Sequence, residues 1–134
     1  MTSKRSVKTM LKRARRATKP FTTVLGGEEL QGTLSAVPYM RWQSLLTDNP
    51  PRDGNSVDAG WGFSVATFWG EALRAGWVEP AMDDEDWDLF FDVTPVAEIT
   101  RLGMDVYALT LSPQELDVPK SSSESTETEP SSSD

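Results

Sequence analysis

Apolar side chains recur every three or four residues in four stretches between residues 38 and 111, and this spacing predicts four amphipathic helices. The first stretch begins at Pro38, a residue favoured in the first turn of a helix. It must end at Asn49, because Pro50 and Pro51 lack an amide donor and disfavour helical backbone in the residue before them. The polar segment that follows, RDGNSVDAGWG, is predicted to be a loop. The apolar face of this first helix would consist of Tyr39, Trp42, Leu45 and Leu46.

Three further helices are delimited by capping and terminating residues. The second begins at Ser64 as N-cap and ends at Gly76, since glycine commonly follows the last turn of a helix. The third begins at Asp83 or Asp84, where the positive end of the helix dipole favours acids. The fourth begins at Thr94, which precedes a proline in the first helical position. The side chains expected in the core are Val65, Phe68, Trp69, Ala72 and Leu73 from the second helix, Trp87, Phe90 and Phe91 from the third, and Val96, Ile99, Leu102, Val106 and Leu109 from the fourth.

A β-hairpin is predicted before the helices. Residues 21–25, FTTVL, are rich in β-branched and aromatic side chains, and Gly26 and Gly27 supply the positive φ angles that a tight turn needs. A second extended piece around Leu30 to Leu34 would pair with the first. Because an isolated hairpin is only marginally stable, we expect it to lie against helices. The predicted fold class is mainly α: a small helical domain of about four helices with a short N-terminal β-hairpin or extended segment.

Charge and composition divide the chain into a basic arm (residues 1–20), a helical domain (residues 21–117) and an acidic Ser/Glu/Thr-rich tail (residues 118–134) that we expect to be disordered. Residues 1–20 contain eight basic and no acidic residues. Residues 21–134 contain five basic and 21 acidic residues and carry a net charge of −16. The basic side chains of the arm are Lys4, Arg5, Lys8, Lys12, Arg13, Arg15, Arg16 and Lys19.

The arm could form a basic amphipathic helix, because its few apolar residues recur at helical spacing. Like charges crowd every face, so we expect it to be disordered until it binds a partner. RNA, an anionic lipid surface or an acidic protein patch would suit its charge, and a mitochondrial presequence has a similar composition. The acidic remainder of the chain would repel phosphate, so nucleic-acid binding through the arm is the alternative function rather than the leading one.

Residue types that carry catalysis or bind metals are scarce. The sequence has no Cys and no His, which excludes disulfides, thiolate and imidazole catalysis and the common zinc sites. The acidic run of residues 83–92 lacks the central Gly and terminal Glu of a calcium loop, and it lies where helix starts favour acids. A carboxylate pair could serve an acid–base hydrolase, but no apolar pocket that would raise one pKa is identifiable. We therefore predict no enzyme activity, no cofactor, no metal and, because no window approaches about 18 apolar residues, no membrane span.

The order of these elements resembles the tail assembly chaperones of long-tailed, non-contractile (siphovirus-type) bacteriophages, most closely those of phages that infect actinobacteria. The resemblance covers about residues 20–117 and rests on LLTDNPPR, GFSVATFWGEALRAGWVEP and TPVAEITRLGMDVYALT. It implies a non-enzymatic protein that acts in the host bacterial cytoplasm during viral tail assembly and is absent from the mature virion. The implied partners are the tape measure protein, which such a chaperone keeps soluble, and the major tail (tube) protein recruited around it.

The resemblance further implies a longer product of the same gene, made by programmed ribosomal frameshifting, as another partner. Val118-Pro119-Lys120 can be encoded with the heptamer C-CCA-AAG, which is of the slippery type and lies where the helical body ends. Association of the short form with itself, as a homo-oligomer, would also suit a long helical client.

Aromatic side chains near helix ends are the predicted partner-binding residues, because they are the least committed to the core. An all-helical body with such side chains would suit the reversible binding of apolar segments. The residues expected on this ground are Trp61, Phe63, Trp69 and Trp77.

Overall fold

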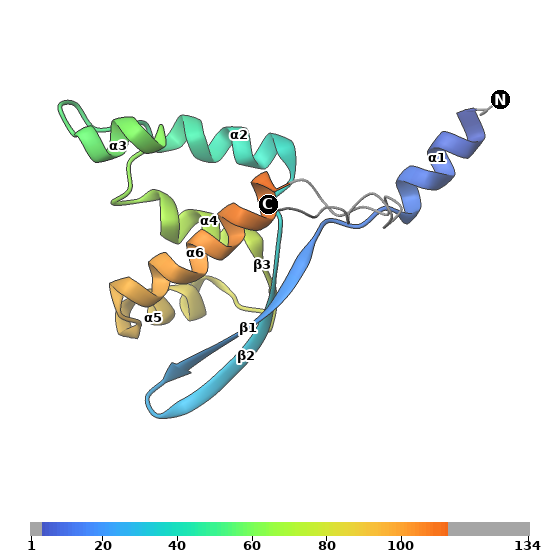
Figure 1. Cartoon of the computed structure of the whole chain (residues 1–134). Helices are drawn as coiled ribbons and strands as arrows, with labels where there is room; N and C mark the ends of the chain where they lie inside the picture. The colour runs from blue at the N-terminus through green and yellow to red at the C-terminus, as the bar shows by residue number, and fades with distance from the viewer. Residues whose placement is uncertain (1–3, 113–134) are drawn as a thin grey trace, which may run out of the picture.

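Three antiparallel strands lie beside six helices in the computed structural model, which describes residues 4–112 (Figure 1). The fold is mixed α and β, so the prediction of a mainly α fold with about four helices is wrong. The elements in chain order are α1 (Lys4–Arg13), β1 (Thr18–Leu25), β2 (Glu28–Ser35), α2 (Tyr39–Asp48), α3 (Ser56–Trp61), α4 (Phe68–Gly76), β3 (Trp77–Glu79), α5 (Asp84–Val93) and α6 (Val96–Leu111).

The hairpin predicted from the sequence is confirmed, and a third strand extends it into a sheet of order β1-β2-β3. Gly26 and Gly27 form the two-residue turn with φ angles of 59° and 84°, which keeps β1 and β2 in register along their length. β3 pairs with β2 where Trp77 lies opposite Leu34. The strand β3 follows α4 without a loop and has only three residues, too few for an alternating pattern to predict it.

Three of the four predicted helices, α2, α5 and α6, are confirmed near their expected bounds. The start of α5 is a capping box, in which the side chains of Asp83 and Asp86 each accept a hydrogen bond from the other residue's amide. α4 begins at Phe68 rather than at Ser64, because residues 64–67 first form a turn. The segment predicted as a loop after the two prolines contains α3, a short helix that Asn55 caps.

The helices α4 and α6 cross at the centre of the domain, and their close approach depends on a glycine. A Cβ atom at Gly103 of α6 would lie 2.6 Å from the carbonyl oxygen of Trp69 on α4, which is closer than Cβ atoms approach other heavy atoms in proteins. Beside this crossing, Phe63 and Phe68 stack with ring centroids 3.8 Å apart, and Trp42 meets Phe68 edge-on at 5.3 Å. The core is therefore aromatic on the side of α4 that faces α2 and α3.

Three side chains expected in the core are instead exposed. Tyr39 and Val96 each occupy the first position of a helix, where a single turn offers little cover. Phe91 lies near the end of α5 and is 38% exposed. Val96 and Phe91 line the same groove.

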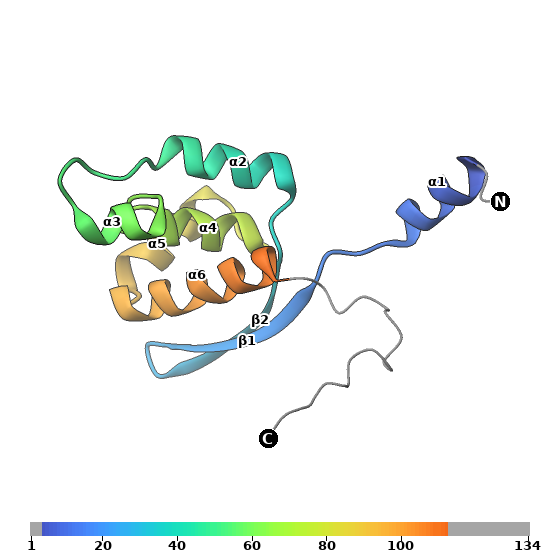
Figure 2. The same ribbon diagram turned by 45° about the horizontal axis from the view of Figure 1, so that its top comes forward.

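The hairpin packs along α6, as both views show (Figure 2). The Thr23 hydroxyl on β1 donates a hydrogen bond of 2.6 Å to Glu98 near the start of α6. Lys19 on β1 forms an ion pair of 3.1 Å with Asp105, two turns further along the helix. The beginning of β1 therefore lies near the C-terminal end of α6.

The helix α1 stands apart from the body of the protein in both views (Figures 1 and 2). Side chains 6–16 are exposed, so residues 4–13 adopt the amphipathic helix that the sequence allowed without burying it. None of the helices in the described range is long and apolar enough to cross a membrane. The predicted disordered tail and the slippery codons at Val118-Pro119-Lys120 lie outside the described residues.

Candidate functional site

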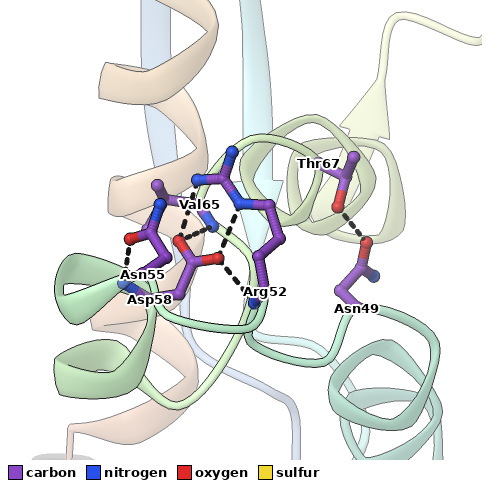
Figure 3. Close-up of polar contacts among 6 residues, drawn as sticks. All are labelled: Asn49, Arg52, Asn55, Asp58, Val65 and Thr67. Atoms are coloured by element: carbon purple, nitrogen blue, oxygen red, sulfur yellow. Dashed lines mark hydrogen bonds and ion pairs between the residues drawn. The ribbon is translucent and has the colours of Figure 1, made fainter.

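An ion pair between the half-exposed Arg52 and the buried carboxylate of Asp58 fixes the loop after α2 (Figure 3). Each carboxylate oxygen of Asp58 accepts two hydrogen bonds, from the Arg52 guanidinium at 2.7 and 3.0 Å, from the Arg52 amide at 2.9 Å and from the Val65 amide at 3.1 Å. The side-chain hydrogen bonds from Arg52 hold the pKa of Asp58 well below its usual range and raise the pKa of the guanidinium. With its carboxylate ionised and fully engaged, this pair holds α3 in place and does not suit proton transfer.

Asn49 forms a second junction of the same segment (Figure 3). Its side-chain amide donates to the Leu45 carbonyl at 2.9 Å and to Glu71 at 3.0 Å, and its side-chain oxygen accepts from the Thr67 hydroxyl at 2.5 Å. The Asn49 carbonyl also accepts from the Ser64 amide at 2.9 Å. The motif LLTDNPPR therefore joins the end of α2 to α3 and to the start of α4.

An open groove of about 440 Å³ lies between α4 and the start of α6, and we call it the α4–α6 groove. Six of its lining residues belong to α4 and the turn before it, and five belong to the end of α5 and the start of α6. The lining residues are Val65, Ala66, Thr67, Trp69, Gly70, Glu71, Phe91, Thr94, Val96, Ile99 and Thr100.

The groove is bordered by apolar side chains that nothing in the described residues covers. Of the lining residues, Val96 is 81% exposed and Phe91 is 38% exposed, and Leu89 and Val93 are further exposed apolar side chains on α5. Within residues 89–96, LFFDVTPV, Phe90 alone among the large apolar side chains is buried. Contiguous exposed apolar surface of this kind marks interaction sites in soluble proteins.

Polar groups of the groove are few. Glu71 lies on the α4 wall, and α5 carries two exposed acids near Phe91 in the sequence, Asp88 one turn before it and Asp92 directly after it. The hydroxyl of Thr94 is buried and has no hydrogen-bond partner within the described residues. The site is therefore apolar at its centre and acidic at its edge.

The four predicted partner-binding residues do not share one surface. Trp61 is 39% exposed and contacts Trp69 and Tyr107, with ring centroids 5.2 and 5.5 Å apart. Phe63 and Trp69 are buried, which confirms the core position predicted for Trp69 from its helical spacing. The argument that a position near a helix end keeps these two side chains free of the core is wrong, although Trp69 does line the groove. Trp77 is partly buried in the sheet and its indole donates to a carbonyl at 2.7 Å. Partner binding by these residues stays a prediction.

The basic residues of the predicted arm also separate into groups. Lys8, Lys12 and Arg13 lie on α1, which begins with Lys4 and Arg5. Lys19 belongs to β1 and pairs with Asp105, as described above. The two remaining cations, Arg15 and Arg16, lie in the connection of residues 14–17.

Sequence reasoning missed the groove because its walls come from three helices and meet only in the fold. The one local signal is the density of apolar residues around the helix break in LFFDVTPV, which exceeds what one helix face can bury. Within residues 4–112, no group of three or more acidic side chains is arranged to hold a metal ion. Comparisons with protein-family models, with curated proteins and with solved structures find no match to this chain.

Proposed function

We propose that this protein is a tail assembly chaperone of a siphovirus-type bacteriophage, and that it binds apolar segments of the tape measure protein in the α4–α6 groove. The observation that carries the proposal is the uncovered apolar lining of this groove, which includes the exposed side chains of Phe91 and Val96. The protein acts by binding, without catalysis, and its further partners are the major tail protein and a longer frameshifted form of itself.

The dimensions and lining of the groove support this assignment. Sites that bind small ligands or protruding side chains enclose about 300–1,000 Å³ and are mostly apolar with few polar groups. A tape measure protein is long and helical, and a helix that lays its apolar face into a groove needs anchoring pockets of this kind. The resemblance to tail assembly chaperones identifies the expected client, and the groove is the surface on which we propose that this client binds.

A charge placed at the groove tests the proposal. Val96→Asp introduces a carboxylate at the first position of α6, where the helix dipole favours an acid, so the fold is not weakened. The matched control is Met40→Asp, which changes an equally exposed apolar side chain in the first turn of α2, away from the groove. Both variants are co-expressed with the tape measure protein, and the soluble fraction of that client is measured.

The wild-type protein and Met40→Asp are expected to keep the tape measure protein soluble, and Val96→Asp is expected to lose this effect. The proposal of a chaperone is wrong if the wild-type protein neither binds nor solubilises the client. The assignment of the groove is wrong if Val96→Asp is as effective as the control.

Nucleic-acid binding through the arm is the second candidate function, and the projection of the basic helix α1 from the body favours it (Figure 1). Phosphate contacts by Lys8, Lys12 and Arg13 would make the affinity fall steeply with salt and vanish when residues 1–17 are deleted. Binding of an apolar client segment in the groove should survive both changes.

A further inference from the structure

The helix α1 carries an uncovered apolar stripe between basic side chains. Val7, Met10 and Leu11 are spaced three and four residues apart, share one face and are all exposed. Lys8 and Lys12 flank this face. The helix therefore has the pattern of a segment that lays apolar anchors into a groove with an acidic edge.

The body of the protein offers such a groove. Residues 21–112 contain four basic and fifteen acidic residues and carry a net charge of −11. Three of the four arginines already pair with acids: Arg52, Arg74 and Arg101. Glu71 lines the α4–α6 groove together with Phe91, and Asp88 and Asp92 are exposed acids on α5, three residues before and one residue after Phe91. The charges of α1 and of the groove are thus complementary, as are their apolar surfaces.

The arm cannot readily reach the groove of its own chain. Ala17 is held near the C-terminal end of α6, because it bonds to Ala36 and the next residue, Val37, bonds to the Thr110 hydroxyl. The groove lies at the other end of this helix, and the fourteen helical steps from Val96 to Thr110 span ~21 Å. The connection of residues 14–17 extends by at most ~14 Å. Even a fully stretched connection would end ~7 Å short of Val96, so α1 would have to fold back along α6 to reach its own groove, whereas both views show it directed away from the body (Figures 1 and 2).

We propose that α1 of one copy of the chain docks into the α4–α6 groove of a second copy, so that the protein associates with itself through its arms. The contact joins two different surfaces, so each copy offers one arm and one groove. Repetition of the contact gives either a closed ring or an open chain of subunits. This inference goes beyond the proposed function, because it requires no client.

Two double variants separate the two halves of the contact. Met10→Asp/Leu11→Asp destroys the apolar stripe of the arm and leaves the groove intact. Asp88→Lys/Asp92→Lys reverses the charge of the groove edge, and lysines in the last two turns of α5 suit the helix dipole. The matched control is Glu28→Lys/Glu29→Lys on β2, which changes the net charge equally at exposed acids that are not on α5, the helix that carries the lining residue Phe91.

The full-length proteins are compared by light scattering over a range of concentrations at low and high salt. The wild-type chain and the hairpin control are expected to associate, and each double variant is expected to need about tenfold or more higher concentration. A mixture of the arm variant and the groove variant is expected to form heterodimers, because one intact arm then meets one intact groove. A docking of the arm on its own chain gives no such complementation.

The proposal is overturned if the wild-type chain is a monomer at all concentrations, or if the mixture does not associate. It is also overturned if the hairpin control loses association as strongly as the groove variant, since net charge alone would then be the cause. Binding of RNA by an otherwise monomeric wild-type chain would assign the arm to nucleic acid instead. The arm variant keeps its groove, so its ability to solubilise the tape measure protein tests the chaperone function separately.

Discussion

The crossing of α4 over α6 gives the sharpest prediction for the fold, because it rests on two glycines in different surroundings. A Cβ atom at Gly103 would lie 2.6 Å from the carbonyl oxygen and 3.0 Å from the Cβ of Trp69. Backbone atoms cannot rotate away, so Gly103→Ala must push α4 from α6. Trp69 is the residue displaced, and it lines the groove.

The magnitude follows from two opposing effects. Replacing a glycine by alanine inside a helix stabilises it by up to about 1 kcal/mol. Inserting a methyl group into a filled space costs typically about 1–3 kcal/mol through displaced neighbours. We expect Gly103→Ala to lower the free energy of unfolding by ~0–2 kcal/mol.

Gly70→Ala is the matched control within the same pair of helices. Its Cβ atom would lie 3.6 Å from a ring carbon of Phe91 and 3.9 Å from a methyl group of Ile99, which are ordinary contacts. This variant keeps the gain in helix propensity and fills part of the groove, so it should raise the free energy of unfolding by up to about 1 kcal/mol.

Urea denaturation of the two variants and of the wild-type chain measures the difference, which we expect to be ~1–3 kcal/mol in favour of Gly70→Ala. Equal stabilities, or a more stable Gly103→Ala, would show that the two helices do not approach as closely as described. The position of Trp69 in the lining of the α4–α6 groove would then be wrong as well.

Three further predictions concern polar groups. Thr94→Val should raise the free energy of unfolding by about 1 kcal/mol, because it removes a buried hydroxyl that lacks a partner; a loss of stability in the same urea assay would show that the hydroxyl is bonded. Hydrogen bonds from Arg101 and Thr23 lower the pKa of Glu98 to about 2, so its stabilisation is complete above pH of about 5 and lost as the pH falls towards 2. Glu98 is partly exposed, so the loss is at most about 1 kcal/mol, and unfolding of Glu98→Gln should depend less on pH over this range. Arg52→Lys cannot make the two-nitrogen contact with the buried carboxylate, so the thermal unfolding midpoint should fall; an unchanged midpoint would show that charge alone suffices.

Local signals in the sequence predict the parts of the fold that form locally. The turn at Gly26 and Gly27 and the helix start at Asp83 or Asp84 were predicted from neighbouring residues, and both are confirmed, with Asp83 as the N-cap. The two prolines after Asn49 end α2 for reasons that hold in any protein.

The missed elements depend on contacts that no periodic pattern in the sequence reports. β3 exists because Trp77 comes to lie beside Leu34, forty-three positions earlier in the chain, and no local pattern reports that pairing. α3 has only six residues, SVDAGW, and it is held by the buried carboxylate of Asp58, which pairs with the half-exposed Arg52. The predicted fold class, mainly α, was wrong because the pairing of β3 with β2 was missed, and this pairing adds a third strand to the hairpin.

The same distinction explains the candidate site. Exposure of Trp61 was predicted from its place at a helix end, and it is partly exposed. The same argument fails for Phe63 and Trp69, because their rings contact each other between the end of α3 and the start of α4 and both are buried. Conversely, Val96 has the right spacing for a core position but begins its helix at the surface. Spacing along one helix says which residues share a face, and only the neighbouring helices decide whether that face is covered.

The segment LLTDNPPR links the end of α2 to the α4–α6 groove. Its prolines end α2 and leave the Asn49 carbonyl available to the Ser64 amide, while the Asn49 side chain binds Thr67 and Glu71. Thr67 and Glu71 are also lining residues of the α4–α6 groove. One wall of the groove is therefore set by a segment that takes no part in binding itself. If the proposed function is right, this accounts for a recognisable sequence at a position without reactive chemistry, because it determines the shape of the surface on which a client or a second copy docks.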